Sequence, residues 1–214
     1  MNNKIINYLD SLFPNPRCEL NYTKDYELLI SVMLSAQTTD KRVNEVTSVL
    51  YKKYDTLEKL ASADVNDIIN IIRPIWTFYK KSSNVIEIAK RLINECDGKV
   101  INDREYLESL PGVGRKTVNV VLANLYNEAL IAVDTHVARV SKRLKLVYNN
   151  DDVLTIEKKL NKKFPKESLG RLHHQLVLFG RYYCKAQNPI CNTCSLSNMC
   201  RYYKKRWLNE IFCP

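Results

Sequence analysis

Apolar residues recur at helical spacing along most of the chain, and this periodicity constrains the fold more than any other feature. The stripes end at helix breakers: the isoleucine-rich stretch 68–72 precedes Pro74, and the stretch 85–92 precedes Gly98. The segment Ala129–Val133 has a β-prone composition, but it is short and has no partner segment. The pattern predicts an all-α protein.

Two glycines lie two positions apart in Leu110-Pro-Gly-Val-Gly-Arg-Lys-Thr117, in a chain with only five glycines. One helical pattern must end at Pro111 and another begins after the turn, so the segment predicts a helix–turn–helix pair. A turn that opens a helix aims free N–H groups at one point, with the positive end of the helix dipole behind them, which suits a phosphate. The predicted phosphate-binding residues are Pro111, Gly112, Val113, Gly114, Arg115 and Thr117.

Lys116 and Asp134 are the candidate reacting groups, and they lie eighteen residues apart. A helix N-terminus disfavours a cation, which makes Lys116 a candidate nucleophile. Asp134, in Val133-Asp-Thr-His136, supplies a carboxylate. Taken singly, Lys116 would more often be a solvated helix lysine and Asp134 an N-cap for the segment 135–144. A phosphate site, a nucleophile and an acid together indicate chemistry on nucleic acid.

Positive charge is concentrated in the second half of the chain. Residues 1–110 hold 15 Lys/Arg and 16 Asp/Glu, whereas residues 111–214 hold 18 and 7, so the net charge of +10 arises after the glycine turn begins. A codon bias toward lysine would spread evenly, and the segregation therefore favours a polyanionic partner. Arg139 and Arg143 are candidate phosphate contacts, although a solvated helix face explains them equally well.

Four of the seven cysteines form the pattern Cys184-x6-Cys191-x2-Cys194-x5-Cys200. Four thiolates within 17 residues can surround one metal centre, and their spacing alone does not separate zinc from an iron–sulfur cluster. A disulfide framework is disfavoured because nothing marks the chain as secreted. Cys18, Cys96 and Cys213 are interpreted as core or surface thiols.

We expect a cytoplasmic, nucleoid-associated protein, because no apolar run is long enough for a membrane span or a signal peptide.

These features in this order resemble the endonuclease III family of bifunctional DNA glycosylases and AP lyases, from about residue 3 to residue 203. Further segments that carry the resemblance are Leu34-Ser-Ala-Gln-Thr-Thr-Asp40, His173-His-Gln-Leu and Gly180-Arg-Tyr. The resemblance implies a helix-hairpin-helix glycosylase fold, with a six-helix barrel domain at 18–128 and a cluster domain formed by 1–17 and 129–214. It also implies a 4Fe-4S cluster on the four cysteines and damaged double-stranded DNA as the partner of a monomer.

The same resemblance implies roles for individual residues. Lys116 matches the Schiff-base lysine and Asp134 the catalytic aspartate. Gln37 matches the residue that fills the gap left by a flipped base, and Phe78 occupies the position of an intercalating residue. The implied activity removes oxidised or ring-saturated pyrimidines and cleaves the strand 3′ to the abasic site by β-elimination.

The loop Ile75-Trp-Thr-Phe-Tyr-Lys-Lys-Ser-Ser83 departs from the family pattern, because Thr77 takes the place of a glycine. The loop must therefore be shaped differently or already lie in a backbone region open to threonine.

Three rival functions are a monofunctional adenine glycosylase, which lacks the lysine at position 116, a non-catalytic DNA-binding module, and a zinc-binding regulator.

Overall fold

The computed structural model describes residues 2–205, and every regular element in that range is helical. The predicted all-α class is therefore confirmed. The β-prone segment 129–133 has no regular secondary structure, and none of its residues is in a strand. Cys213 lies outside the described residues. Among the described helices, none combines the length and the apolar character that crossing a membrane requires.

The chain divides into two compact units, Cys18–Tyr126 and a second one formed by Met1–Arg17 with Asn127–Pro214. We call them the hairpin unit and the cysteine unit after the motifs that they contain. The hairpin unit consists of α2 (Asp25–Leu34), α3 (Asp40–Lys53), α4 (Leu57–Ala61), α5 (Val65–Ile72), α6 (Phe78–Cys96), α7 (Arg104–Ser109) and α8 (Arg115–Leu125).

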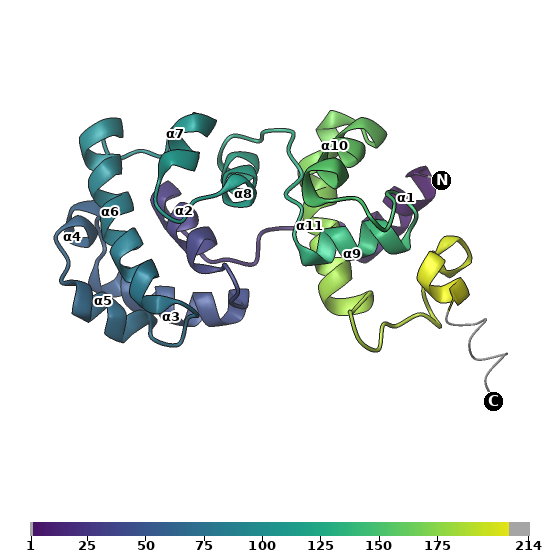
Figure 1. Cartoon of the computed structure of the whole chain (residues 1–214), viewed down its shortest axis with the longest axis horizontal. Helices are drawn as coiled ribbons and strands as arrows, with labels where there is room; N and C mark the ends of the chain where they lie inside the picture. Colours follow the sequence, from purple (N-terminus) through teal and green to yellow (C-terminus); the bar gives the residue numbers. More distant parts are fainter. Residues whose placement is uncertain (1, 206–214) are drawn as a thin grey trace. The chain divides into compact units, whose positions relative to one another are not determined.

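Helix α6 is the longest helix among the described residues, and it packs against α2, α4 and α5 (Figure 1). Helix α2 also contacts α3 and α8, and α7 contacts α8. The apolar stripes predicted from the sequence supply the buried core, as for Leu28, Ile68, Ile88 and Val121, which are all fully buried. Burial of these stripes stabilises the short helices, which would be marginal alone.

The cysteine unit consists of α1 (Asn2–Leu12), α9 (Thr135–Arg143), α10 (Val153–Lys163) and α11 (Leu169–Leu178). A π-helical turn, Phe179–Tyr183, continues α11, and 3-10 turns form at Lys166–Ser168 and Ser197–Met199. Helix α1 packs on α11, and this contact joins the two chain segments of the unit. Gln175 Nε2 of α11 donates to Asp10 Oδ1 of α1 at 2.8 Å. Ile5, Leu9 and Leu176 are fully buried in one apolar core.

Helix boundaries follow the predicted capping chemistry with small shifts. Asp103 caps the helix before Pro111 and accepts a hydrogen bond from Tyr106 N at 3.0 Å, although the neighbouring Asn102 is an equally suitable cap by residue type. Gly98 lies just past α6, as predicted, with φ +75° and its N–H bonded to Leu92 O. Both side-chain types cap helices well, so a one-residue shift is invisible in the sequence.

Candidate functional site

The turn between α7 and α8 exposes main-chain N–H groups at the start of a helix. Leu110 and Val113 are buried and anchor the turn, and Val113 N donates to Leu110 O at 3.1 Å. Gly114 is the N-cap of α8 and has no side chain that can accept from the first-turn amides. That turn contains no acidic residue. The N-terminus of α8 is therefore open to an anion, as the sequence predicted for a phosphate.

The two glycines of this turn have different structural roles. Gly112 has φ +76°, in the left-handed region, and a Cβ there would lie 2.5 Å from Asn84 Nδ2 and 3.4 Å from Met33 Cγ. Gly114 has φ −113°, which any residue can adopt, and a Cβ there would meet nothing within 4 Å. Gly112 thus allows close packing of the turn on α6 and α2, whereas Gly114 leaves its outer side open.

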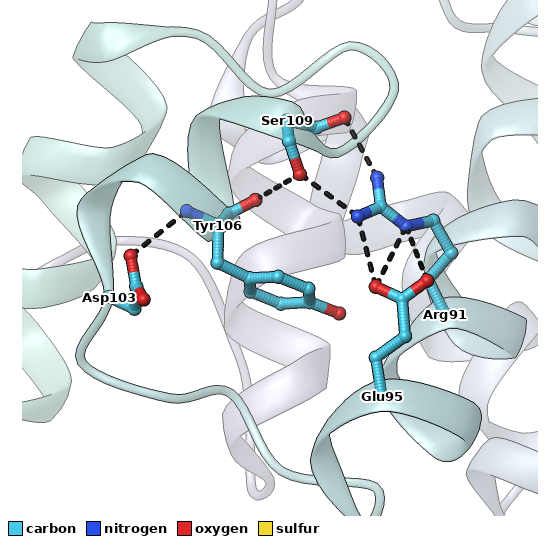
Figure 2. Close-up of polar contacts among 5 residues, drawn as sticks. All are labelled: Arg91, Glu95, Asp103, Tyr106 and Ser109. Atoms are coloured by element: carbon cyan, nitrogen blue, oxygen red, sulfur yellow. Dashed lines mark hydrogen bonds and ion pairs between the residues drawn. The ribbon is translucent and has the colours of Figure 1, made fainter.

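Arg91 of α6 holds the first helix of the hairpin in place (Figure 2). Its guanidinium donates to Ser109 O and to Ser109 Oγ, both at 2.9 Å, at the last residue of α7. Glu95 orients the guanidinium through a 3.0 Å ion pair, and the group lies 5.3 Å from the centre of the Tyr106 ring. Burial raises the pKa of Tyr106, which therefore stays neutral beside the guanidinium. The contacts fix α7 relative to α6.

Lys116 lies in the first turn of α8 and its side chain is exposed. Its neighbours Gly114 and Arg115 are exposed as well, whereas Thr117 is buried beneath them. A flexible lysine on an open helix N-terminus can approach an atom next to a bound phosphate. The sequence predicts a nucleophile at this position.

Gln37 and Phe78 are presented by two further loops of the hairpin unit. Gln37 is exposed in the turn after α2 and has φ +58°. Phe78 is the first residue of α6 and is half-buried, with its ring 4.3 Å from that of Tyr79. Trp76 and Tyr79 beside it are 64% and 68% exposed, so this loop presents more aromatic surface than Phe78 alone.

Thr77 is the residue of the altered loop that has an unusual backbone conformation. Its backbone has φ +57° and ψ 34°, which is the left-handed conformation that favours glycine. The threonine therefore adopts a glycine-like geometry at an energetic cost, and the loop does not avoid that region. Of the two outcomes expected from the sequence, this geometry bears on the second: Thr77 lies in the small left-handed region, which is open to threonine but costs energy.

Asp134 is the N-cap of α9 and is half-buried in the cysteine unit. Its Oδ1 accepts a hydrogen bond from Val137 N at 2.8 Å. The capping role that the sequence offered as the ordinary interpretation is thus present. A cap bond to one oxygen keeps the carboxylate in a fixed orientation, and it is compatible with a second role for the group.

Arg139 and Arg143, predicted as phosphate contacts, bind main-chain carbonyls of their own unit. Arg139 donates to Gly180 O at 2.8 Å and to Cys184 O at 3.1 Å. Arg143 donates to Lys185 O at 2.7 Å, and its Nη1 lies 3.3 Å from Cys184 Sγ. Burial lowers the pKa of Arg139. Both guanidinium groups therefore support the cysteine loop, and contact with DNA phosphates stays a prediction for them.

The four clustered cysteines line one mostly apolar cavity. Its wall consists of Leu144, Phe179, Cys184, Pro189, Ile190, Cys191, Cys194, Ser197, Cys200, Tyr202 and Tyr203. None of the six cysteines at described positions is in a disulfide, and no three His, Cys, Asp or Glu side chains in residues 2–205 converge as they would on a single ion. Burial raises the pKa of the Cys184 and Cys194 thiols. This arrangement suits a metal cluster, which occupies more volume than a single metal ion.

Lys81, Asn84 and Arg91 were not singled out from the sequence, although Lys81 and Arg91 bond to main-chain carbonyls of the loops and Asn84 lies close to Gly112. The sequence pattern alone could have identified Lys81. It lies four residues before Val85 on the apolar stripe of α6, so a charged residue occupies a core-facing position. Asn84 and Arg91 carried no such signal, because their partners Gly112 and Ser109 are distant in sequence.

Comparison with known proteins agrees with this geometry. Residues 30–166 match the HhH-GPD superfamily base excision DNA repair protein family. The chain is 43% identical over 198 residues to endonuclease III of Bacillus subtilis (strain 168), which covers 92% of this chain and 90% of the relative. It is 41% identical over 192 residues to endonuclease III of Escherichia coli (strain K12), with 90% of each chain covered.

Solved structures give the same result for the fold. A trapped endonuclease III–DNA covalent intermediate matches with a TM-score of 0.91 and 43% identity over 97% of this chain and 99% of the other. A non-covalent endonuclease III–DNA complex matches with a TM-score of 0.92 and 43% identity, over 96% of each chain. The predicted family and fold class are thereby confirmed.

Proposed function

Because this chain belongs to the endonuclease III family of the HhH-GPD superfamily, we propose that it removes oxidised or ring-saturated pyrimidines from double-stranded DNA. It is a base-excision-repair DNA glycosylase with AP lyase activity, as the family is. The observation that carries the lyase assignment is the exposed Lys116 on the open N-terminus of α8. A monofunctional adenine glycosylase would lack this lysine.

The hairpin binds a phosphate of the damaged strand next to the lesion. The glycine turn and the N-terminal amides of α8 donate to its oxygens, and Arg115 adds positive charge. Such a contact positions the strand and reads no sequence. The damaged nucleotide leaves the duplex, at a cost that the lesion itself lowers. Gln37 fills the gap and Phe78 wedges into the base stack.

Lys116 then acts as the nucleophile. Its neutral amine forms a bond to C1′ of the sugar, and the bond from C1′ to the damaged base breaks, so that the base departs with the bonding electron pair and takes up a proton. Ring opening gives an imine between Nζ and C1′. Loss of a C2′ proton and departure of the 3′ phosphate complete the β-elimination, and hydrolysis of the imine frees the enzyme.

Asp134 stabilises the positive charge that develops on the sugar and assists the proton transfers. The capping bond from Val137 N keeps the carboxylate oriented. His136 and the pair His173 and His174 serve a structural role instead. In support, His173 is buried and its ring lies 5.1 Å from that of His174.

The cofactor is a 4Fe-4S cluster held by Cys184, Cys191, Cys194 and Cys200. The chemistry of the donor set supports it, since four thiolates in an apolar cavity are typical of such clusters. A single zinc ion would require sulfurs gathered about 2.3 Å from one point. The cluster supplies no step of the excision reaction. We also propose that the enzyme acts as a monomer in the cytoplasm, associated with the nucleoid.

Borohydride trapping tests this function. The protein is mixed with duplex DNA containing an abasic site, and borohydride reduces any imine to a stable covalent adduct. We expect an adduct with the wild type and with Lys158→Gln, a control that removes an exposed lysine of α10. We expect none with Lys116→Gln, although this variant still binds the DNA. Absence of a wild-type adduct on bound DNA would exclude the lyase mechanism.

A further inference from the structure

Lys81 is a buried lysine that bonds to the main chain. Its residue is only 5% exposed, on the core-facing side of α6. The Nζ atom donates to Leu34 O at 2.9 Å and to Ala36 O at 2.6 Å. Lysine is rarely buried to this degree, because its charge must leave water. Its position therefore calls for an explanation other than chance.

The two acceptors lie at the C-terminal end of α2. Carbonyl groups there have no partner within the helix, and the negative end of the helix dipole favours a cation. Desolvation lowers the pKa of Lys81 to about 8, so the ammonium form still predominates at pH 7. The ammonium thus serves as a C-cap that reaches across from another helix.

The segment that Lys81 holds contains Gln37. Leu34 is the last residue of α2, and Ala36 directly precedes Gln37. Gln37 has φ +58°, a conformation that a non-glycine residue keeps only when its surroundings enforce it. The turn has a local bond from Thr38 N to Ser35 O at 3.0 Å, and the contacts to Lys81 tie it to the body of the unit.

Lys81 is also in the first turn of α6, whose N-terminus presents Phe78. Its own N–H donates to Thr77 O at 3.1 Å, so one residue contacts both loops. A simple space-filling role would be met by methionine, which has a similar length and no charge to desolvate. The two hydrogen bonds to main-chain carbonyls indicate instead that Lys81 fixes the position of the segment to which it bonds.

From these contacts we infer that Lys81 is a positioning residue: it fixes the Gln37 turn relative to the Phe78 segment, so that the two side chains enter the DNA together at a damaged site. The inference rests on the proposed function, in which Gln37 and Phe78 insert into the duplex. It adds a residue that touches neither DNA nor the reacting atoms and acts through Gln37.

A double-mutant cycle on DNA affinity tests the inference. The variants are Gln37→Ala, Lys81→Met and their combination, and the control is Lys90→Met, which removes an exposed lysine from the same helix. Affinity is measured for a duplex with a stable abasic analogue and for the undamaged duplex. Urea unfolding shows whether each variant is folded.

We expect Gln37→Ala and Lys81→Met each to lower the preference for the abasic-analogue duplex about tenfold, a loss within the range of couplings between neighbouring residues. The combined variant should lose no more than either single variant, whereas Lys90→Met keeps the preference. If Lys81→Met does not fold, Lys81→Gln, which keeps an uncharged donor, takes its place in the cycle.

If the losses of preference in the two single variants multiply in the combined variant, Lys81 does not act through Gln37. That result would overturn the inference. A Lys81 variant that keeps the full preference would overturn it as well. If Gln37→Ala alone has no effect, the inserting role of Gln37 fails and the inference fails with it, while the trapping experiment on Lys116 still decides the lyase assignment.

Discussion

The contrast between Gly112 and Gly114 allows a sharp test of the hairpin geometry. Gly112→Ala forces a side chain into the left-handed region, which costs about 1–2 kcal/mol, and brings Cβ within 2.5 Å of Asn84 Nδ2. Asn84 is buried, so it cannot simply rotate into solvent, and overpacking of this kind costs about 1–3 kcal/mol. Reduced entropy of the unfolded chain returns about 0.4–1 kcal/mol. The net expected loss of stability is about 1–4.5 kcal/mol.

Gly114→Ala is the matched control, because its φ is ordinary and its Cβ meets nothing within 4 Å. Its unfolding free energy should stay within about 1 kcal/mol of the wild type, since a weaker cap offsets the entropic gain. Its affinity for abasic-site DNA should fall nonetheless, as the new methyl group lies on the side where a phosphate must approach.

Urea unfolding of both variants, followed by circular dichroism, measures these changes. Adding Asn84→Ala to Gly112→Ala removes the clash and should recover about 1–3 kcal/mol relative to independent effects. A Gly112→Ala protein within about 0.5 kcal/mol of the wild type would refute the packing argument, because neither the backbone strain nor the contact with Asn84 would then be real.

Three further predictions concern single residues. Thr77→Gly should raise the free energy of unfolding by about 0.5–1 kcal/mol, because glycine relieves the left-handed strain. Part of this gain is lost because glycine increases the entropy of the unfolded chain. A free energy of unfolding in urea that is unchanged or lower would count against strain at this residue. Asp134→Asn should change stability by less than about 0.5 kcal/mol, since asparagine caps helices as well as aspartate, while single-turnover base excision falls steeply; full turnover would show that the carboxylate only caps α9. Cys194→Ser should weaken or abolish the broad absorption near about 400 nm expected of a Cys-ligated cluster, and a wild type that contains zinc and lacks this band would exclude the cluster.

The sequence predicted most of the helices because their apolar stripes are also the buried surfaces. Helix α8 runs from Arg115 to Leu125 as expected, since a glycine turn precedes it and a dense apolar pattern fills it. The limits appear where several residues satisfy the same local rule. Asp103 and Asn102 are both good caps, and Val49 of α3 is 53% exposed although it is apolar.

The positions of the candidate residues were less predictable than the motifs that contain them. Arg139 and Arg143 look like a basic helix face, yet their partners are carbonyls about 40 residues further along the chain. The left-handed backbone of Thr77 is likewise not predictable from its residue type, since threonine has no preference for that region. Contacts of this kind arise from tertiary structure, which residue types and spacing do not encode locally.

The proposed lyase mechanism depends most directly on the identity of the nucleophile. Trapping the wild type on abasic-site duplex with borohydride, digesting both components and sequencing the modified peptide by mass spectrometry identifies the amine that bonds to C1′. We predict that the sugar remnant is attached to Lys116, in the peptide that begins the second helix of the hairpin. A remnant on any other amine, with Lys116 unmodified, would contradict the mechanism.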